Sequence, residues 1–341
     1  MRKTSGNISN MNALLLVPSE LAGCIRRKGW QRLTPRAVLE LAAPHTWGAS
    51  VMPVILASAF AISMDGAFSF PLFFSLIATS VCLQCAVNTL NDYSDFISGA
   101  DRFENCHDPT DASLVYHDYE PVLAFVIGVA FIGAGLLCGL YAIFTVGPEL
   151  LIFGAVGAAV VFLYSYGILP LSYTPVGEFL SGVVMGGIIP VACFYAFTRQ
   201  LSVWVLVYSI PVIVTIALIM MTNNGSDIEK DIESARHTLP TRIGRARTKK
   251  LHAVFFTAAM AAAAAVAAFR FPQGVWLLPL LCAWLIPNEY KLQNAGLTPE
   301  NRVISMALST GANIKLNAVY AAMILLPKIS FTQTPISGFF A

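Results

Sequence analysis

Charged residues are scarce in this sequence. Only 12% of its 341 residues are Asp, Glu, Lys or Arg, whereas about 25% of the residues of an ordinary soluble domain are charged. Hydrophobic residues, by contrast, make up 56% of the chain. This balance excludes an ordinary soluble globular protein and predicts an integral membrane protein that lies in a lipid bilayer. We expect no nucleic-acid partner.

Cysteines with the spacing of a metal site are also lacking. The seven cysteines are scattered along the chain, and the close pair Cys82 and Cys85 falls within an apolar run without a nearby Cys or His. We interpret this pair as packing rather than as a metal or redox site.

Long apolar runs define the expected architecture. About nine of them are long enough to cross roughly 30 Å of hydrocarbon as helices, which predicts an all-α, polytopic membrane protein. The expected spans are residues 47–64, 70–90, 120–145, 149–166, 177–197, 203–221, 252–269, 273–287 and 313–330. Three regions follow from these spans: a cytoplasmic N-terminal segment with a surface helix over residues 26–41, a transmembrane domain and a C-terminal tail, at residues 1–46, 47–330 and 331–341.

Lys and Arg are distributed unevenly between the loops. They concentrate before the first expected span and again between the sixth and the seventh, from Lys230 to Lys250, and basic residues stay on the cytoplasmic side of a membrane. We therefore expect a multi-pass protein of the plasma or inner membrane, with the loops after spans two, four, six and eight in the cytoplasm. Lys315 is expected at the cytoplasmic mouth of the last span, and spans seven to nine show no comparable stripe of polar residues.

The second expected span ends in a stripe of polar side chains. At spacings of i, i+3, i+4 and i+7 it comprises Asn88, Asn91, Asp92 and Asp95. A helix that continues through these residues places all four on one face. Gly99 is expected to stop this helix in front of Asp101. The acidic segment 101–120 has two interpretations: a solvated surface, or a lid whose Asp101 joins a metal site.

The sixth expected span ends in a similar stripe. It comprises Asn223, Asn224, Asp227 and Asp231. Asn223, Asp227 and Asp231 are separated by steps of four, which again favours one helix face. Arg236, Thr238 and Arg242 follow closely, and we expect this partly basic cluster to bind an anion.

The loop after the fourth span is rich in tyrosine. It contains Tyr164, Tyr166 and Tyr173 with two prolines, and no charged residue before Glu178. This composition fits either a shaped polar-aromatic wall or the anchoring of tyrosines at the membrane interface.

The two acidic stripes predict a metal site. A carboxylate at membrane depth costs roughly 2.5 to 3.5 kcal/mol to insert, so clustered carboxylates need cations. Asp and Asn oxygens without His or Cys favour Mg²⁺, which is usually completed by substrate phosphates. The expected ligand is a diphosphate bridged through Mg²⁺ to both stripes, with Arg236 and Arg242 on its remaining charge. A cation-coupled transporter is the competing interpretation, although these acids lie at helix ends rather than at the midplane.

A diphosphate at the rim of an apolar bundle indicates an apolar tail, as in a polyprenyl diphosphate. Loss of the diphosphate would leave an allylic cation that must be kept from water. Apolar walls would exclude water, and the ring faces of Tyr164, Tyr166 or Tyr173 could stabilise the cation.

The motifs together resemble those of the UbiA superfamily of membrane aromatic prenyltransferases, and most closely its 1,4-dihydroxy-2-naphthoate polyprenyltransferase branch. The first motif, from Asn91 to Phe96 with Gly99 and Asp101, is similar to the family's first aspartate-rich motif. The second, from Asp227 to Asp231 with Arg236, Thr238 and Leu239, is similar to its second. Further matches are Leu39-Glu40-Leu41 with Pro44, and the segment from Tyr164 to Glu178.

The resemblance implies nine transmembrane helices around a central cavity that cytoplasmic loops cap. It implies that Asn91 and Asp95 bind one Mg²⁺ and that Asp227 and Asp231 bind a second. Catalytic roles are assigned to Asp92, Tyr164 and Arg236. Contacts with the substrate or the metal complex are assigned to Asn88, Asp101, Asn223, Asn224, Tyr173, Thr238 and Arg242.

The function implied is Mg²⁺-dependent transfer of a polyprenyl chain from its diphosphate to an aromatic acceptor, 1,4-dihydroxy-2-naphthoate, in menaquinone biosynthesis. Alternatives are another acceptor, namely a hydroxybenzoate, a tocopherol precursor or a lipid alcohol, and the cation-coupled transporter. The sequence departs from the family pattern at Ala235, where glycine is usual. It also has Ile168 where the hydroxybenzoate branch has a lysine four residues after its tyrosine.

Overall fold

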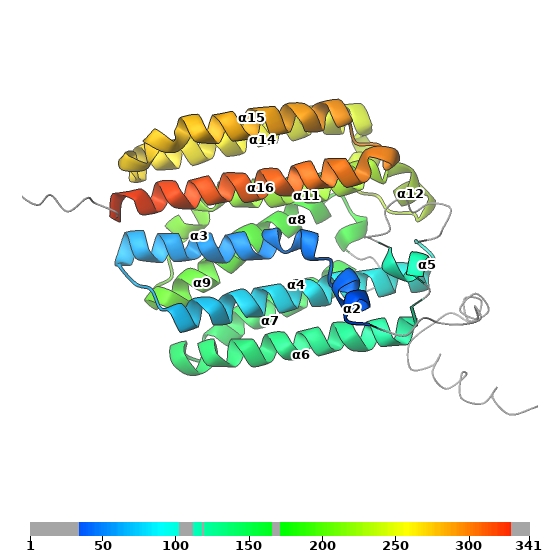
Figure 1. Ribbon diagram of the computed structural model, residues 1–341, viewed down its shortest axis with the longest axis horizontal. Coiled ribbons are helices and arrows are strands. Elements are labelled where there is room, and N and C mark those ends of the chain that lie inside the picture. The colour runs from blue at the N-terminus through cyan, green and yellow to red at the C-terminus, as the bar shows by residue number, and fades with distance from the viewer. Residues whose placement is uncertain (1–33, 102–111, 118, 166–170, 329–341) are drawn as a thin grey trace, which may run out of the picture. The chain divides into compact units, whose positions relative to one another are not determined.

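The structure is a computed structural model that describes residues 34–101, 112–117, 119–165 and 171–328 (Figure 1). Within these ranges the chain is helical with short turns and contains no β-strand. The predicted all-α class is therefore confirmed there. Residues 26–33 of the predicted surface helix, Tyr166, Ile168 and the predicted tail lie outside the described residues.

The described residues fall into two compact units. The first contains residues 34–44 and 85–132, and the second contains residues 45–84 and 133–328. Two long helices, α4 (Phe70–Ser98) and α6 (Pro121–Val146), each contribute residues to both units.

The first unit is built on the C-terminal part of α4. Helices α2 (Pro35–Ala42) and α5 (Ser113–His117) and the start of α6 complete it. Thr34 caps α2, because its Oγ1 accepts a hydrogen bond from the Ala37 N–H at 3.2 Å. A small apolar core holds the unit together and comprises Ala37, Leu41, Tyr93, Leu114, Tyr119 and Ala124.

The second unit contains the remaining helices. Their bounds are α3 (Gly48–Asp65), α7 (Leu150–Ser165), α8 (Gly177–Val183), α9 (Ile189–Thr198), α10 (Val203–Tyr208), α11 (Ile210–Ser226), α12 (Ile228–Glu233), α13 (Leu239–Ile243), α14 (Arg245–Arg270), α15 (Leu278–Ala295) and α16 (Arg302–Leu325). A π-helical segment, η4 (Val184–Ile188), joins α8 to α9, and a 3-10 turn, η3 (Leu171–Tyr173), precedes α8.

Helix α11 forms the centre of the second unit. It packs against α8, α14 and α16, while α16 also packs against α3 and α15 (Figure 1). The core between these helices is apolar and includes the fully buried side chains of Phe60, Leu285, Leu316 and Tyr320. Between helices that lie in lipid, close van der Waals packing of such side chains, rather than their removal from water, holds the helices together.

Glycines allow α8 and η4 to approach α11 closely. A Cβ atom on Gly186 would lie 2.6 Å from the Cα of Ile213, which is closer than van der Waals contact permits. Gly182 likewise faces the backbone of Ile213. Small residues at such crossings let helix backbones pack tightly within a membrane.

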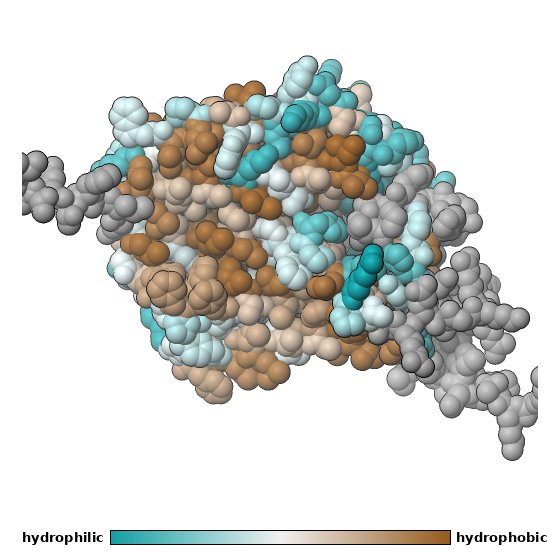
Figure 2. Space-filling model, viewed as in Figure 1, coloured by the Kyte–Doolittle hydropathy of each residue, from teal (hydrophilic) through white to brown (hydrophobic). Residues whose placement is uncertain are grey.

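Several helices are long and apolar enough to cross a membrane. In the described part of the chain there are five, at Gly48–Asp65, Phe70–Ser98, Pro121–Val146, Gly177–Thr198 and Arg245–Arg270. Shorter apolar helices lie at Leu150–Val160 and Ile210–Ser226. Nine spans around a central cavity stay a prediction. Large apolar side chains such as Phe144 and Phe269 are exposed, and Figure 2 shows many apolar side chains on the visible face, as lipid contact requires.

Two of the last helices begin before the predicted spans. Helix α14 begins at Arg245 rather than near residue 252, and α16 begins at Arg302 rather than near residue 313. Both helices continue into polar sequence, which a search for apolar runs cannot detect. Lys315 lies in the middle of α16, and its Nζ donates to Asn288 Oδ1 at 2.9 Å; its place at a membrane mouth stays a prediction.

Candidate functional site

The first motif lies on the last turns of α4, in the first unit. The helix runs through all four predicted residues and ends at Ser98, so the helical interpretation of the stripe is confirmed. Asn91 Nδ2 donates to Asp95 Oδ2 at 3.0 Å, one turn apart. Asp92 and Asp95 are 6% and 7% exposed. The stripe therefore presents amide and carboxylate oxygens from a buried helix face.

Gly99 stops the helix as the sequence predicts. Its φ of +73° belongs to the left-handed region that glycine adopts without strain. The chain then turns back, and the Asp101 N–H donates to the carbonyl oxygen of Asp95 at 3.1 Å. The buried Asp101 carboxyl is thus held beside the end of the first motif; the segment that follows it, 102–111, lies outside the described residues.

Helix α2 is tied to the first motif by hydrogen bonds. Asn88 Nδ2 donates to the carbonyl oxygen of Ala42 at 3.0 Å, and Thr89 Oγ1 donates to that of Leu41 at 3.1 Å. The Asn88 amide therefore supports the end of α2, while contact of Asn88 with substrate stays a prediction.

Glu40 on α2 is the centre of a polar cluster that sequence analysis noted without a role. It accepts hydrogen bonds from Tyr119 Oη at 2.8 Å and from Arg36 Nε at 2.9 Å. Burial acts to raise the pKa of Glu40, but these hydrogen bonds and the nearby His117 hold it below its usual value. Burial and the bond to Glu40 raise the pKa of Tyr119 to about 12. This cluster joins α2 to the segment after α5.

The second motif lies where α11 ends and α12 begins, in the second unit. Asp227 interrupts the helix, with φ −105° and ψ 21°. Backbone hydrogen bonds between residues four apart nevertheless continue across the break. The Asp227 N–H donates to Asn223 O at 3.2 Å, and the Asp231 N–H donates to Asp227 O at 2.8 Å. The predicted steps of four thus correspond to successive turns of a bent helix.

Side-chain hydrogen bonds from neighbouring elements hold the second motif in place. Thr238 Oγ1 donates to Asp231 Oδ2 at 3.0 Å. Glu178, at the start of α8, accepts hydrogen bonds at Oε1 from Asn224 Nδ2 at 2.9 Å and from the Leu239 N–H at 3.1 Å. Its Oε2 is buried without a hydrogen-bond partner among the described residues. Glu178 therefore links three elements behind the motif.

Asp231 is 2% exposed. Burial raises its pKa to about 7, although the Arg236 guanidinium and the Thr238 hydrogen bond act in the opposite direction. A carboxyl in this condition is stabilised in its ionised form by a further cation.

Arg236 is held between the motif and the aromatic loop. The guanidinium carbon of Arg236 lies 4.5 Å from the centroid of the Tyr173 ring. The backbone N–H of Arg236 donates to the carbonyl oxygen of Asp231 at 2.7 Å. The His237 N–H donates to the Tyr173 carbonyl oxygen at 2.8 Å. The turn passes through Ala235 at φ 54°, the left-handed conformation that glycine favours.

The other predicted residues are placed less closely around this motif. Tyr164 lies near the end of α7 and is partly exposed, and Arg242 lies on α13 with an exposed side chain. In the described residues no three His, Cys, Asp or Glu side chains form a cluster that could hold a metal.

Arg302 is a contact that sequence analysis missed. It is the first residue of α16 and 4% exposed; its Nε donates to Asp227 Oδ2 at 3.0 Å, and its Nη2 donates to Asn223 Oδ1. Because 75 residues separate Arg302 from Asp227, no local spacing reveals the pair.

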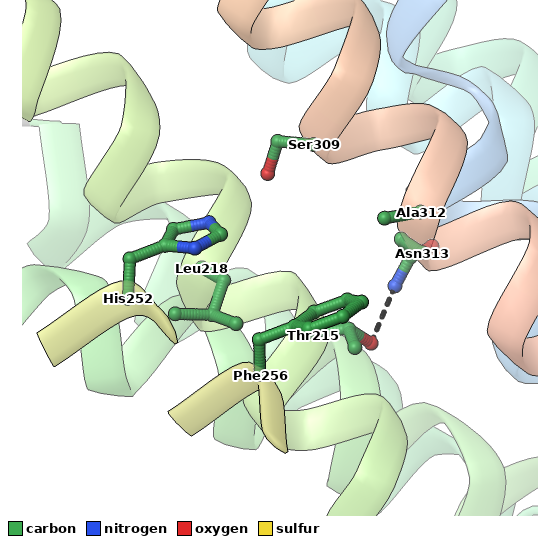
Figure 3. A pocket seen from close by; sticks show the side chains of 7 residues that line it. All are labelled: Thr215, Leu218, His252, Phe256, Ser309, Ala312 and Asn313. Atoms are coloured by element: carbon green, nitrogen blue, oxygen red, sulfur yellow. Dashed lines mark hydrogen bonds between the residues drawn. The ribbon is translucent and has the colours of Figure 1, made fainter. Parts of the chain in front are cut away.

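Helix α16 also carries a polar stripe, contrary to the expectation for spans seven to nine. The stripe comprises the buried residues Arg302, Ser305, Ser309, Asn313 and Asn317. Asn313 Nδ2 donates to Thr215 Oγ1 on α11 at 2.8 Å. Ser309 and Asn313 line a small pocket together with His252 (Figure 3). The Nδ1 of His252 lies 3.1 Å from Glu289 Oε1. These polar residues are three or four positions apart with mostly apolar residues between them, so sequence analysis did not detect the stripe.

A comparison with protein families identifies the chain. The model of the UbiA prenyltransferase family matches residues 50–310. The chain belongs to this family. The predicted family and the predicted enzyme class, a prenyltransferase, are confirmed.

Relatives of this UbiA family member include a 1,4-dihydroxy-2-naphthoate octaprenyltransferase of Bacillus subtilis. It is 31% identical over 223 residues, which cover 64% of this chain and 70% of the relative. A UbiA prenyltransferase domain-containing protein 1 of Gallus gallus is 28% identical over 310 residues, covering 88% and 90% of the two chains.

The fold agrees with that of solved UbiA homologues. The structure of a UbiA homologue from Archaeoglobus fulgidus bound to DMAPP and Mg²⁺ matches with a TM-score of 0.58 at 15% identity, covering 84% of this chain and 99% of that one. The chain thus shares the fold of the UbiA membrane prenyltransferases.

Proposed function

We propose that this prenyltransferase transfers a polyprenyl chain from a polyprenyl diphosphate to 1,4-dihydroxy-2-naphthoate, and that it depends on Mg²⁺. The observation that carries the metal-dependent part is the buried Asp231 carboxyl beside Asp227, with the Arg236 guanidinium at the same loop. The acceptor is supported by the naphthoate octaprenyltransferase of Bacillus subtilis, at 31% identity.

The residues fit a magnesium ion. Asn91 and Asp95 in the first unit, and Asp227 and Asp231 in the second, supply hard oxygen donors without His or Cys. Burial of the Asp231 carboxyl, which raises its pKa despite the nearby Arg236, is a second argument, because a bound cation would stabilise the ionised form. A related solved homologue binds Mg²⁺ together with DMAPP.

Basic and aromatic groups beside the second motif fit the rest of the donor. Arg236, oriented by the ring of Tyr173, can pair with diphosphate oxygens that the metal leaves uncompensated. The hydrogen bond from Thr238 keeps the Asp231 carboxylate in place as the substrate binds. Tyr173 and Tyr164 supply aromatic faces for a developing allylic cation.

Bound Mg²⁺ would withdraw electrons from the diphosphate and make it a better leaving group. In the reaction, the bond between the first prenyl carbon and the diphosphate oxygen breaks, and the diphosphate leaves with the electron pair. The ring carbon that bears the acceptor's carboxylate forms a new bond to that prenyl carbon. As the family resemblance implies, the carboxylate then leaves as carbon dioxide, and the electrons of its bond restore the aromatic ring. The residues of the chain position the charges and exclude water, since a free allylic cation would otherwise react with it.

The test is turnover by the purified protein. Radiolabelled polyprenyl diphosphate is incubated with 1,4-dihydroxy-2-naphthoate, with and without EDTA, and we expect product only without the chelator. Asp227→Ala should abolish product formation, because it removes a metal ligand. Asp65→Ala, which removes an exposed carboxylate at the end of α3, is the matched control and should retain it. Full turnover in EDTA would contradict the metal assignment.

The acceptor is tested by a panel. A hydroxybenzoate, a tocopherol precursor and a lipid alcohol are offered in place of the naphthoate under the same conditions. Ile168 stands where the hydroxybenzoate branch has lysine, so we expect hydroxybenzoate to be a poor acceptor. Preferred use of any of these compounds would replace the naphthoate assignment while leaving the prenyltransferase intact.

A further inference from the structure

An arginine side chain from α16, which is distant in sequence, contacts the second motif. Arg302 opens α16 and spans two side chains of the motif, with Nε on Asp227 Oδ2 at 3.0 Å and Nη2 on Asn223 Oδ1. The Asp227 side chain is 14% exposed and that of Arg302 is 5% exposed. The contact is therefore largely withdrawn from water.

Stability alone is a weak reason for such a contact. Removing two charges from water costs several kcal/mol, and apolar residues of similar volume often stabilise a protein as well as a buried ion pair does. A guanidinium contributes instead a rigid, planar set of donors that fixes the direction of its acceptors. Here the acceptors are Asn223, one turn before the bend at the end of α11, and Asp227, at which the helix bends.

We propose that Arg302 is the positioning residue of the second motif, which orients Asn223 and Asp227 for uptake of the magnesium–diphosphate complex. This inference rests on the proposed metal dependence. Arg302 compensates the buried Asp227 charge before the metal arrives and holds one oxygen of each side chain in a fixed direction. Residues that orient metal ligands in this way typically change metal affinity by 10- to 100-fold when they are replaced.

The second unit offers a matched control. Arg245, the first residue of α14, forms a bidentate ion pair with Glu229, with Nη1–Oε1 and Nη2–Oε2 distances of 2.9 and 2.7 Å. Glu229 lies on α12 between Asp227 and Asp231, but it is not a predicted ligand. Arg245→Gln therefore removes a charge and a more exposed interhelical ion pair without removing a contact with the Asn223 or Asp227 side chain. The Arg245 Nε also donates to the carbonyl oxygen of Gly225 at 3.4 Å.

The experiment measures metal uptake rather than turnover. The protein in detergent is titrated with Mg²⁺ at saturating inorganic pyrophosphate, and the thermal unfolding midpoint is measured at each Mg²⁺ concentration. The rise of the midpoint with Mg²⁺ concentration gives the concentration that half-saturates the site. We expect Arg302→Gln and Arg302→Lys to raise this concentration about 10- to 100-fold, and Arg245→Gln to leave it unchanged. The midpoint without metal reports separately whether each variant is folded.

Each outcome is decisive. Lysine keeps the positive charge but lacks the planar set of guanidinium donors. Normal metal uptake by Arg302→Lys would therefore overturn the positioning role and leave Arg302 only as a compensating charge. Normal uptake by both variants would overturn the inference while the metal-dependent function stands. Absence of any response in the unsubstituted protein would overturn the proposed metal dependence, and this inference with it.

Discussion

At the scale of single residues, Ala235 adopts a backbone conformation that suits glycine. Its φ is 54°, and it forms the turn between Asp231 and Arg236, the residue that we propose to bind the diphosphate. A residue with a Cβ in this conformation costs roughly 1 to 2 kcal/mol, of which the greater freedom of glycine in the unfolded chain offsets about half.

Ala235→Gly should therefore raise the free energy of unfolding by about 0.5 to 1 kcal/mol. Thermal unfolding of the purified protein measures the change. Ala43→Gly, at the second alanine with a left-handed backbone, φ 46°, should act in the same direction. A lower unfolding midpoint for both variants would show that neither turn is strained.

The Glu40 cluster predicts a pH dependence of stability. The pKa of Glu40 is lowered in the folded protein, so its contribution is present above the pKa of the unfolded chain and is lost as the pH falls through the folded value. Glu40→Gln should lower the unfolding midpoint at pH 7 by about 2 °C. The difference should begin to shrink once the pH falls below about 4.3, the pKa of Glu in an unfolded chain, and should vanish only below the lowered pKa of the folded protein. Exposed Glu233 provides the control variant Glu233→Gln, which should show no such pH-dependent difference.

Residue-level prediction succeeds where partners are close in sequence. The spacing of Asn91 and Asp95, and the proximity of Asp231 to Thr238, both correspond to observed hydrogen bonds. Contacts made by Glu178 and Arg302 bridge 46 and 75 residues. Only the packing of whole helices brings such pairs together, and no spacing rule encodes it.

At the scale of elements, the crossing of η4 and α11 depends on a missing side chain. Gly186 faces the backbone of Ile213 so closely that a methyl group cannot be accommodated. Helix α8, which continues into η4, carries Glu178, which accepts the hydrogen bond from Asn224 of α11 behind the second motif. Separation of α11 from its neighbour would therefore disturb the motif as well as the packing.

Gly186→Ala should destabilise the protein by about 1 to 3 kcal/mol, the usual cost of overpacking a close contact. Thermal unfolding provides the measurement, and turnover should fall in parallel. Gly311→Ala on α16 is the matched control, because no atom of a neighbouring element lies within 4 Å of the added methyl group. Equal effects of the two changes would indicate that the crossing tolerates a Cβ atom.

Elements were predictable to the extent that they are apolar. The run starting at Phe70 predicts α4, whereas the polar first turns of α14 and α16 were assigned to loops. The buried polar stripe of α16 was missed for the same reason, since its residues satisfy their hydrogen bonds on neighbouring helices rather than in water. Local composition carries no record of those partners.

At the scale of the whole molecule, the two motifs belong to different compact units. We propose that each motif binds one metal ion, as the family resemblance implies. We expect two Mn²⁺ ions to bind in the presence of pyrophosphate, counted by electron paramagnetic resonance. Asp95→Asn and Asp227→Asn should each leave one ion bound.

The same measurement tests whether the motifs act together. Dipolar coupling between the two Mn²⁺ ions in the unsubstituted protein is expected if both hold one diphosphate, because the coupling requires short separation. Two uncoupled ions would contradict the shared site and leave each motif as a separate metal-binding element.

The polar stripe of α16 has a consequence for how the protein is made. A helix that carries Arg302, Lys315 and Asn313 gains little from entering lipid alone, since hydrocarbon offers no partner for these groups. Thr215 on α11 and Asp227 at its end provide such partners, and the ribosome synthesises them first. Biogenesis therefore has a direction: the earlier helices form a receptor in the bilayer, and the last helix completes it on arrival.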